Sequence, residues 1–328
     1  MVCPVAVIGV GVMGINHARI YQTMPEAELV AIADTNVTCA KKVAEKYNIP
    51  YYCSVHDLLS NHHIEAASVS VPTSLHAPVA RELLSAGIHV LVEKPLAPTV
   101  AECQELCALS EQSETIVMVG HVERFNPAVR KLRELIREGK FGDITSIITR
   151  RVGLAPPRIR DADVVTDLAV HDIDIANFLI GKQPVDVYAN CGYGNLRDRV
   201  DFAEIFLNYG TCNAIISVNW LTPLKIRKMS ITGTQGYAEL DFIRQELLLF
   251  EAPASNSFDG FADFINKYGH DDTHCLPISF TEPLAAELAY FIHCVQTRTQ
   301  PEVGCNEAIA VLTIVREVLQ KKFADKHI

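Results

Sequence analysis

Short apolar segments alternate with amphipathic ones along the first third of the chain. Stretches rich in Val, Ile and Ala have the length of buried strands, and the segments between them have a helix-compatible pattern that often ends at glycine or asparagine. The expected strands cover residues 5–9, 29–33, 67–71, 90–92 and 116–120. The expected helices cover residues 13–23, 37–47, 76–86 and 99–112. This alternation predicts an α/β fold with a doubly wound parallel sheet, a Rossmann-like arrangement.

The pattern changes after Gly120, where apolar and polar residues alternate in strands without intervening helices. Such runs predict a largely antiparallel or mixed open sheet and a second domain of α+β type. A chain of 328 residues suits two domains, which we place at residues 1–121 and 122–328. One face of an open sheet needs a cover, which predicts a homodimer or homotetramer.

Composition and charge narrow the class of protein. The formal net charge of -10 argues against nucleic acid or an anionic membrane as the main partner. The N-terminus lacks the pattern of a signal peptide, and no apolar run approaches the ~20 residues of a membrane helix. The ten cysteines are scattered, as expected of reduced thiols in a cytoplasmic protein. The spacings of Cys103 with Cys107 and of His270 with His274 match no familiar zinc site, so we expect no metal.

A glycine-rich segment after the first strand predicts a dinucleotide site. Gly9-Val10-Gly11-Val12-Met13-Gly14 has the pattern G-x-G-x-x-G, between an expected strand and an expected helix. The first glycine permits the tight turn, the second admits a pyrophosphate, and the third lets helix pack on strand. Asp34, which ends the second strand, would accept hydrogen bonds from ribose hydroxyls, and this carboxylate favours NAD over NADP. The alternative is a glycine-rich turn beside a surface aspartate.

Two further segments carry candidate chemistry. Lys94 follows the strand at residues 90–92, at the edge where parallel sheets bind ligands, so it is a candidate acid or base. The alternative is a salt bridge of Glu93 that caps the strand. Asp167 and His171 are four residues apart and would share one helical face, so the carboxylate could orient the imidazole. The alternative there is a helical ion pair.

Glu93-Lys94-Pro95, downstream of the glycine motif, resembles the signature of the Gfo/Idh/MocA oxidoreductase family, and the resemblance covers essentially the whole chain. It implies that Lys94 is catalytic beside the nicotinamide and that Asp167 and His171 join it around a reacting alcohol. It also implies that Glu93 lies near the nicotinamide ribose. The residues that it places along the nicotinamide side are Val71, Thr73 and His76. The sequence departs from the family at 161–165, where glycines are usual, so contacts of that loop with substrate are in doubt.

Local basic clusters in an acidic chain suggest an anionic substrate. Together with the Arg124-Phe125-Asn126-Pro127 segment, they resemble the nucleotide-sugar branch of the family. That resemblance implies oxidation of the 3-hydroxyl of UDP-N-acetylglucosamine to a 3-keto sugar. A partner aminotransferase would consume this product in cell-surface glycan (lipid A) biosynthesis. The candidate substrate-binding residues are Arg124, Asn126, Arg151, Arg158, Arg160, Asp167, His171 and Lys225.

Three alternatives stay open at this point. The substrate could be an uncharged polyol or free sugar, as for inositol or glucose dehydrogenases. The chain could be a non-catalytic NAD-binding regulator, although such a protein would not need Lys94, Asp167 and His171. Either Lys94 or His171 could accept the hydroxyl proton; we favour His171.

Overall fold

The computed structural model describes residues 2–156, 162–251 and 273–321. The chain folds into two compact units. Met1–Phe125 and Glu282–Thr313 form the N-terminal unit, whereas Asn126–Thr281 and the segment from Ile314 onward form the C-terminal unit. The chain therefore leaves the N-terminal unit after Phe125 and returns to it at Glu282.

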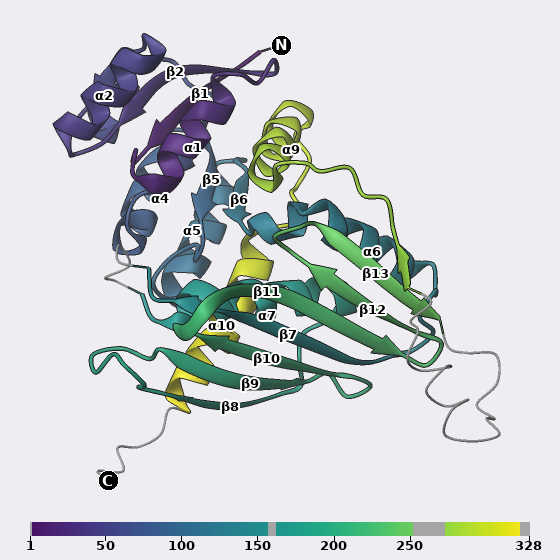
Figure 1. The fold of residues 1–328 in the computed structure, drawn as a ribbon. Coiled ribbons are helices and arrows are strands. Elements are labelled where there is room, and N and C mark those ends of the chain that lie inside the picture. The colour runs from purple at the N-terminus through teal and green to yellow at the C-terminus, as the bar shows by residue number, and fades with distance from the viewer. Residues whose placement is uncertain (1, 157–161, 252–272, 322–328) are drawn as a thin grey trace, which may run out of the picture. The chain divides into compact units, whose positions relative to one another are not determined.

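The N-terminal unit is built on a six-stranded sheet in which every pair of neighbours is parallel (Figure 1). Its strand order is β3-β2-β1-β4-β5-β6, which confirms the predicted doubly wound arrangement. The strands are β1 (Cys3–Ile8), β2 (Ala27–Ala33), β3 (Tyr51–Tyr52), β4 (Ala66–Val69), β5 (His89–Glu93) and β6 (Val117–Gly120). The order reverses between β1 and β4, and ligands of such sheets bind outside the carboxyl ends of the strands at that point.

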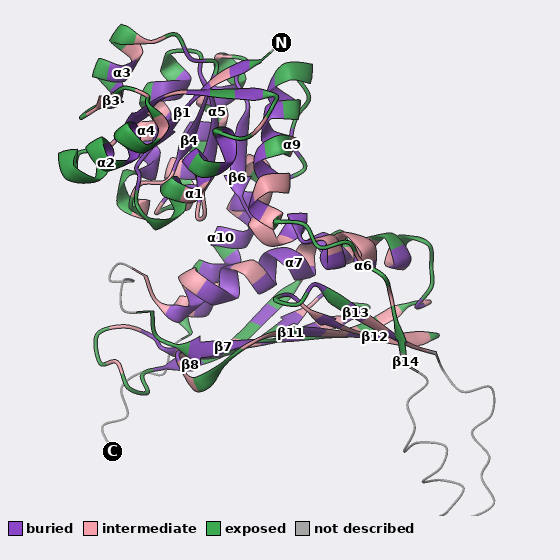
Figure 2. Cartoon of the chain, turned by 45° about the horizontal axis from the view of Figure 1, so that its top comes forward, coloured by how far each residue is buried: buried purple, intermediate pink, exposed green. Residues whose placement is uncertain are grey.

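The helices of this unit begin and end at residues with capping chemistry. Ser54 accepts a hydrogen bond from the Asp57 amide and Thr99 accepts one from the Glu102 amide. Asn48 and Gly87 follow helices with positive φ, at 54° and 76°, as expected of helix ends. The helices are α1 (Val12–Tyr21), α2 (Val37–Tyr47), α3 (Val55–Asn61), η1 (Thr73–Leu75), α4 (His76–Ser85), α5 (Val100–Gln112) and η2 (Val122–Phe125). Figure 2 shows buried strands between helices whose outer faces are exposed.

Helix α9 (Pro283–Thr297) belongs to the N-terminal unit, although our single division at residue 121 assigned it to the second domain. Leu288, Phe291 and Ile292 are each 0% exposed and join the core formed by β1, β4 and β5. Helix α10 (Cys305–Gln320) crosses the division, because its residues up to Thr313 belong to the N-terminal unit. The single division at residue 121 therefore did not anticipate the core that these two helices join.

The C-terminal unit contains an eight-stranded sheet with order β14-β13-β12-β11-β7-β10-β9-β8. Strands β7 and β10 run parallel and all other neighbours run antiparallel, which confirms the predicted mixed sheet. The strands are β7 (Ile144–Leu154), β8 (Asp186–Gly192), β9 (Phe202–Asn208), β10 (Asn213–Asn219), β11 (Leu221–Gly233), β12 (Gly236–Asp241), β13 (Glu246–Glu251) and β14 (Thr273–Cys275). Helices α6 (Pro127–Arg137) and α7 (Val170–Ile180) pack on one face. We did not predict β14.

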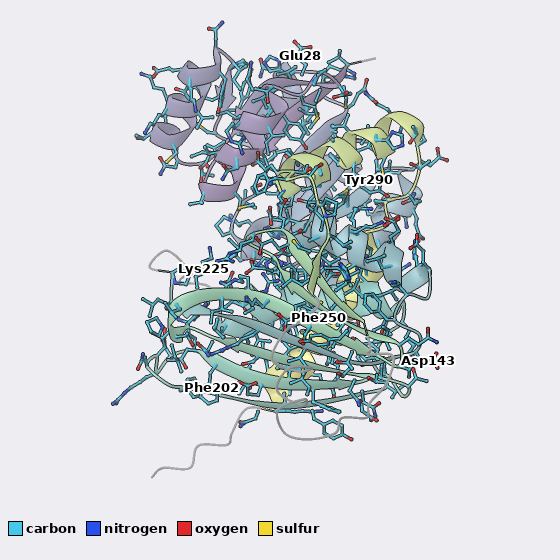
Figure 3. All side chains as sticks on the ribbon, turned by 45° about the vertical axis from the view of Figure 1, so that its right-hand side comes forward. Glu28, Asp143, Phe202, Lys225, Phe250 and Tyr290 are labelled. Atoms are coloured by element: carbon cyan, nitrogen blue, oxygen red, sulfur yellow. The ribbon has the colours of Figure 1, made fainter. Side chains whose placement is uncertain are left out.

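The opposite face of this sheet carries an apolar row across four adjacent strands. Tyr188 pairs with Phe206, Phe206 with Ile215, and Ile215 with Ile148. Their exposed fractions are 58%, 36%, 39% and 46% in the order Tyr188, Phe206, Ile215 and Ile148. Phe250, labelled in Figure 3, contacts Tyr237 farther along the sheet with ring centroids 5.4 Å apart. Within the described ranges, no helix has the length and apolarity that crossing a membrane requires.

Candidate active site

The glycine motif forms a tight turn from β1 into α1. Gly9 has φ of +84°, and a Cβ there would lie 2.8 Å from the backbone of Ser70. A Cβ at Gly14 would lie 1.8 Å from the Gly9 carbonyl oxygen, so both positions require glycine. A Cβ at Gly11 would meet no protein atom within 4 Å, so the space beside it is open to a ligand. Among the described residues no side chain caps α1, so its first-turn amides can donate hydrogen bonds to a pyrophosphate.

Val12 and Met13, the two middle residues of the motif, are 55% and 37% exposed at the start of α1. Their backbone amides belong to the first turn, where a phosphate would bind. The apolar side chains at this exposed position leave the N-terminus of the helix free of competing carboxylates, since the first turn contains no acidic residue. We therefore expect Val12 and Met13 to contact the cofactor through their backbone amides and not through their side chains.

Asp34 stands at the carboxyl end of β2 and holds the glycine turn in place. One carboxylate oxygen accepts a hydrogen bond from the Val10 amide at 2.8 Å, and the other accepts one from the Asn36 amide at 2.7 Å. The side chain is half-buried, and a carboxylate oxygen can accept more than one hydrogen bond. Asp34 can therefore hold the loop and still accept ribose hydroxyls, which fits the residue to an adenosine ribose.

His76 connects the ends of β4 and β5. Its Nε2 lies 2.9 Å from the Val71 carbonyl oxygen and its Nδ1 lies 2.8 Å from the Pro95 carbonyl oxygen. The ring is 1% exposed, so these contacts brace the two strand-end loops against each other. Val71 and Thr73 are half-buried at the same edge of the sheet. The structure thus gives His76 a bracing contact in addition to the predicted place on the nicotinamide side.

Glu93 and Lys94 lie at the carboxyl end of β5, next to the β1–β4 reversal point. Both side chains are half-buried, and one Glu93 oxygen lies 3.3 Å from the Lys94 amide. The other Glu93 oxygen accepts a hydrogen bond at 3.2 Å from Nε2 of His17, on α1. Burial raises the pKa of Glu93, but the hydrogen bond from His17 and the charges of His17, Lys94 and His76 outweigh it and hold the pKa below its usual value.

His17 is the residue of this region that the sequence analysis missed. It is 0% exposed, and among the described residues its Nδ1 has no hydrogen-bond partner. The available signal was a polar residue on the helix face that also carries Ala18 and Tyr21, both buried. A buried imidazole on that face needs a partner inside the unit, and the carboxylate of Glu93 provides it.

Asp167 and His171 lie on one continuous helix of the C-terminal unit, as predicted. Asp167 falls in a π-helical turn, η3 (Val165–Ala169), which leads directly into α7. Asp163 caps the start of this helix by accepting a hydrogen bond from the Thr166 amide at 2.8 Å. Both candidate side chains are half-buried. Single π-helical turns inside α-helices occur frequently at functional sites, and the residue pattern did not predict this one.

Most of the basic residues predicted to bind substrate make contacts within the fold. Arg151 is 4% exposed; its Nε donates to Asp172 at 2.9 Å, and its guanidinium lies 4.8 Å from the Phe242 ring centroid. Arg124 is 4% exposed and donates to the Glu302 carbonyl at 3.0 Å. These contacts hold each arginine inside its own unit, so both have a structural role.

Asn126, another predicted substrate residue, caps α6 and donates to the Phe242 carbonyl at 3.0 Å. Lys225 is exposed on β11, where it is labelled in Figure 3, and it is accessible to an anionic ligand. Arg158 and Arg160 lie outside the described residues. Of the predicted cations, Lys225 therefore has the accessibility that a diphosphate contact needs.

A cavity of about 1000 Å³ in the N-terminal unit does not coincide with the predicted site. Its lining includes Cys107, Thr115, Val117, Arg298 and Cys305, and none of the residues that we predicted for cofactor or catalysis. Val117 begins β6, so the cavity lies at the opposite edge of the sheet from Lys94. The candidate site is therefore defined by chemistry at the strand ends.

Comparison with known proteins assigns the family. Residues 3–121 match the model of an oxidoreductase family with an NAD-binding Rossmann fold, and residues 129–239 match the Gfo/Idh/MocA C-terminal domain. UDP-N-acetylglucosamine 3-dehydrogenase of Acidithiobacillus ferrooxidans is 30% identical over 293 residues, covering 88% of this chain and 87% of the relative. The solved structure of that enzyme superposes with a TM-score of 0.85 at 26% identity, covering 97% of this chain and 96% of that one.

A second relative, the scyllo-inositol 2-dehydrogenase (NAD(+)) of Bacillus subtilis, is 25% identical and covers 94% of this chain and 91% of its own length. Both family models, and relatives that span nearly the full length, agree with the observed order of a parallel sheet followed by a mixed sheet. The chain belongs to the Gfo/Idh/MocA oxidoreductase family, and its N-terminal unit is an NAD-binding Rossmann fold.

Proposed function

We propose that the protein is an NAD-dependent dehydrogenase that oxidises a secondary hydroxyl of a nucleotide sugar. The favoured substrate is UDP-N-acetylglucosamine, with oxidation of the 3-hydroxyl to a ketone. The observation that carries this choice is the 30% identity, over 88% of the chain, to an enzyme of that activity. The inositol dehydrogenases that span a comparable length are 24–25% identical. Lys225 supplies one accessible cation for a diphosphate.

Three side chains would carry the chemistry of the reacting alcohol. His171 accepts the hydroxyl proton, and Asp167, four residues earlier on the same helix, orients its imidazole. Lys94 hydrogen-bonds the same oxygen and stabilises the alkoxide that develops on it. The glycine turn and Asp34 would hold NAD, which would supply the acceptor for the hydride of the carbinol carbon. The roles of Lys94 and His171 can be exchanged without changing the net reaction, because either group can relay the proton.

The experiment mixes the protein with NAD, UDP-N-acetylglucosamine and a glutamate-dependent sugar aminotransferase, and follows the nucleotide sugar by mass spectrometry. The aminotransferase removes the ketone, whose formation can be unfavourable alone. A nucleotide sugar with an amino group at carbon 3 supports both substrate and position. Omitting the protein is the first control, and replacing NAD with NADP tests the preference that we assign to Asp34.

A polyol substrate is the second candidate, because two inositol dehydrogenases match 94% and 96% of the chain. The same assay with myo-inositol, scyllo-inositol and glucose, read as NADH absorbance, distinguishes the two candidates. Reduction of NAD by a polyol without conversion of the nucleotide sugar would overturn our choice. A protein that binds NAD but reduces it with none of these compounds would instead fit a non-catalytic regulator.

We further propose that two copies of the chain associate through the open face of the mixed sheet. The support is the cross-strand row of Tyr188, Phe206, Ile215 and Ile148, since contiguous exposed apolar surface is characteristic of protein interfaces. We expect a dimer or tetramer mass in light scattering, and a smaller species after Ile215→Asp, which places a charge in the middle of the row. The matched control is Val37→Asp, which places the same charge at an apolar position, 47% exposed, on α2 of the N-terminal unit. A monomer mass for the unaltered protein would contradict the proposal.

A further inference from the structure

His17 is placed to link the helix that follows the glycine turn with the strand end that carries Lys94. It lies on α1, three residues after Gly14, and is 0% exposed. Its Nε2 lies 3.2 Å from Oε1 of Glu93, whose side chain is 14% exposed. Because Glu93 has a lowered pKa, its ionised carboxylate only accepts hydrogen bonds, so His17 is the donor. The contact therefore joins two segments of the cofactor edge that are 76 residues apart.

The second oxygen of Glu93 is held equally closely. It lies 3.3 Å from the Lys94 amide, and a Cβ at Gly120, the neighbour of Glu93 in the register of β5 and β6, would come within 3.2 Å of it. The carboxylate is thus confined between α1 on one side and β6 on the other. A group held at both oxygens in this way has one orientation, and its backbone continues directly into Lys94.

We propose that His17 is a positioning residue: it fixes the Glu93 carboxylate and thereby sets the position and charge environment of the Lys94 side chain. This inference rests on the proposed function for the role of Lys94. His17 is buried, so it acts through Glu93 and not on the substrate. Three cationic or titratable groups face Glu93 in this arrangement, namely His17 from α1, Lys94 from the strand end and His76 from α4.

A loss of this link has a defined effect on catalysis. When His17 becomes Leu, Glu93 loses the donor that holds its orientation and its ionised state, and the Lys94 ammonium loses a fixed anionic neighbour. Misplacement of a reacting group by about 1 Å can cost ~10²-fold in rate. We therefore expect kcat of His17→Leu to fall at least ~10-fold, whereas the dissociation constant for NAD changes less than ~3-fold. His17→Gln retains a donor of similar reach and should restore kcat to within ~3-fold.

A matched control separates positioning from a merely structural role. His89 is a second buried histidine of the same unit, 2% exposed, at the amino end of the same strand β5. His89→Asn should lower the melting temperature without changing kcat of the folded enzyme. His17→Leu combined with Glu93→Gln should lose no more than the more severe single variant, because the two residues act as one unit. Full additivity of the two losses, or a normal kcat in His17→Leu, would overturn the inference.

A readout that needs no substrate keeps this test distinct from that of the proposed function. Lys94 and Lys41 are labelled with an amine-selective acetylating reagent, and peptide mass spectrometry gives their relative rates. Lys41 is an exposed reference, 61% exposed in its side chain. We expect the relative rate of Lys94 to change at least ~3-fold in His17→Leu but not in His17→Gln, because the Glu93 carboxylate beside Lys94 is no longer held in one place. An unchanged rate refutes the inference even if no sugar is turned over. Absence of turnover by the unaltered protein refutes only the proposed function.

Discussion

Charged side chains gather in two regions of the molecule, and the two groups differ in burial and in the partners that they contact. At the carboxyl edge of the parallel sheet, Asp34 and Lys94 stand half-buried just beyond strand ends, and two backbone amides hold the Asp34 carboxylate. In the C-terminal unit, Arg151 on β7 and Asp172 on helix α7 have side chains only 5% and 1% exposed, and they pair with each other. Residue type does not separate an accessible charge from a buried one. The half-buried charges stand beyond strand ends, whereas Arg151 lies within β7 and its partner lies on the helix that covers that strand.

The largest expected effect is at the parallel edge. Lys94→Ala should lose ~10²–10⁴-fold in turnover, since it removes a group that acts on the reacting oxygen. Melting temperature and NAD affinity should stay close to those of the unaltered protein, because Lys94 is half-buried beyond the end of β5. Steady-state kinetics and fluorescence titration with NAD measure the two quantities. Near-normal turnover would remove Lys94 from the mechanism.

The interior of the mixed sheet should respond in the opposite way. Arg151→Met removes the guanidinium that pairs with the buried Asp172 carboxylate, and breaking a buried pair costs about 3–5 kcal/mol of stability. Urea unfolding measures this loss, and the KM for the nucleotide sugar should remain unchanged in the folded fraction. Lys225, an exposed cation on β11, provides the matched comparison. Lys225→Ala should raise KM for the nucleotide sugar without a change in stability. A raised KM in Arg151→Met at unchanged stability would instead make Arg151 a substrate residue.

The buried His89 of the N-terminal unit should make the stability of the protein depend on pH. Burial, and then the charge of Arg298, lower the pKa of His89 from 6.5 to about 4. The folded state therefore favours the neutral ring, and this contribution to stability is present above pH 6.5 and is lost as the pH falls to 4. The loss amounts to about 3 kcal/mol at most. His89→Asn keeps an acceptor for the Ile116 amide, so its unfolding free energy should be less dependent on pH in this window. Parallel pH profiles of the two proteins would contradict the assignment.

The smallest expected effect is the change in NAD affinity on Gly11→Ala, and Gly14→Ala in the same turn provides the comparison. Gly11→Ala meets no protein atom within 4 Å, so stability should be preserved while NAD affinity falls ~10-fold through contact with the pyrophosphate. Gly14→Ala places a Cβ 1.8 Å from the Gly9 carbonyl oxygen, so it should destabilise the unit itself. Thermal melting with and without NAD measures both. Equal melting temperatures for the two variants would show that the turn adapts.

The sequence predicted best those features that depend on neighbouring residues. Local periodicity located strands β5 and β6 to within a few residues, and glycine chemistry located the turn at Gly9. The position of Asp34 directly after β2 followed from the strand pattern and the spacing from the glycine motif. These predictions succeed because backbone geometry and short-range patterns determine them.

Features that depend on distant partners were not accessible in the same way. Burial of Arg151 depends on Asp172, which is 21 residues away, and the hydrogen bond of His17 depends on a strand 76 residues later. The π-helical turn at Asp167 and the return of α9 to the first core are likewise set by packing. In a single sequence, such contacts are visible only as polar residues on otherwise apolar faces. That pattern shows that a buried partner is needed but does not identify it.

The return of α9 has a consequence for the order in which the protein can fold during synthesis. The core of the NAD-binding unit includes Leu288, Phe291 and Ile292, which leave the ribosome after the entire mixed sheet. Domains generally fold in the order in which they are made, but here the first unit to emerge is completed only after the entire mixed sheet has been made. Until α9 arrives, the surface that it buries on the nascent unit stays open. Chaperone binding to ribosome-bound chains should therefore persist until residues near 313 are exposed, far beyond the end of the parallel sheet.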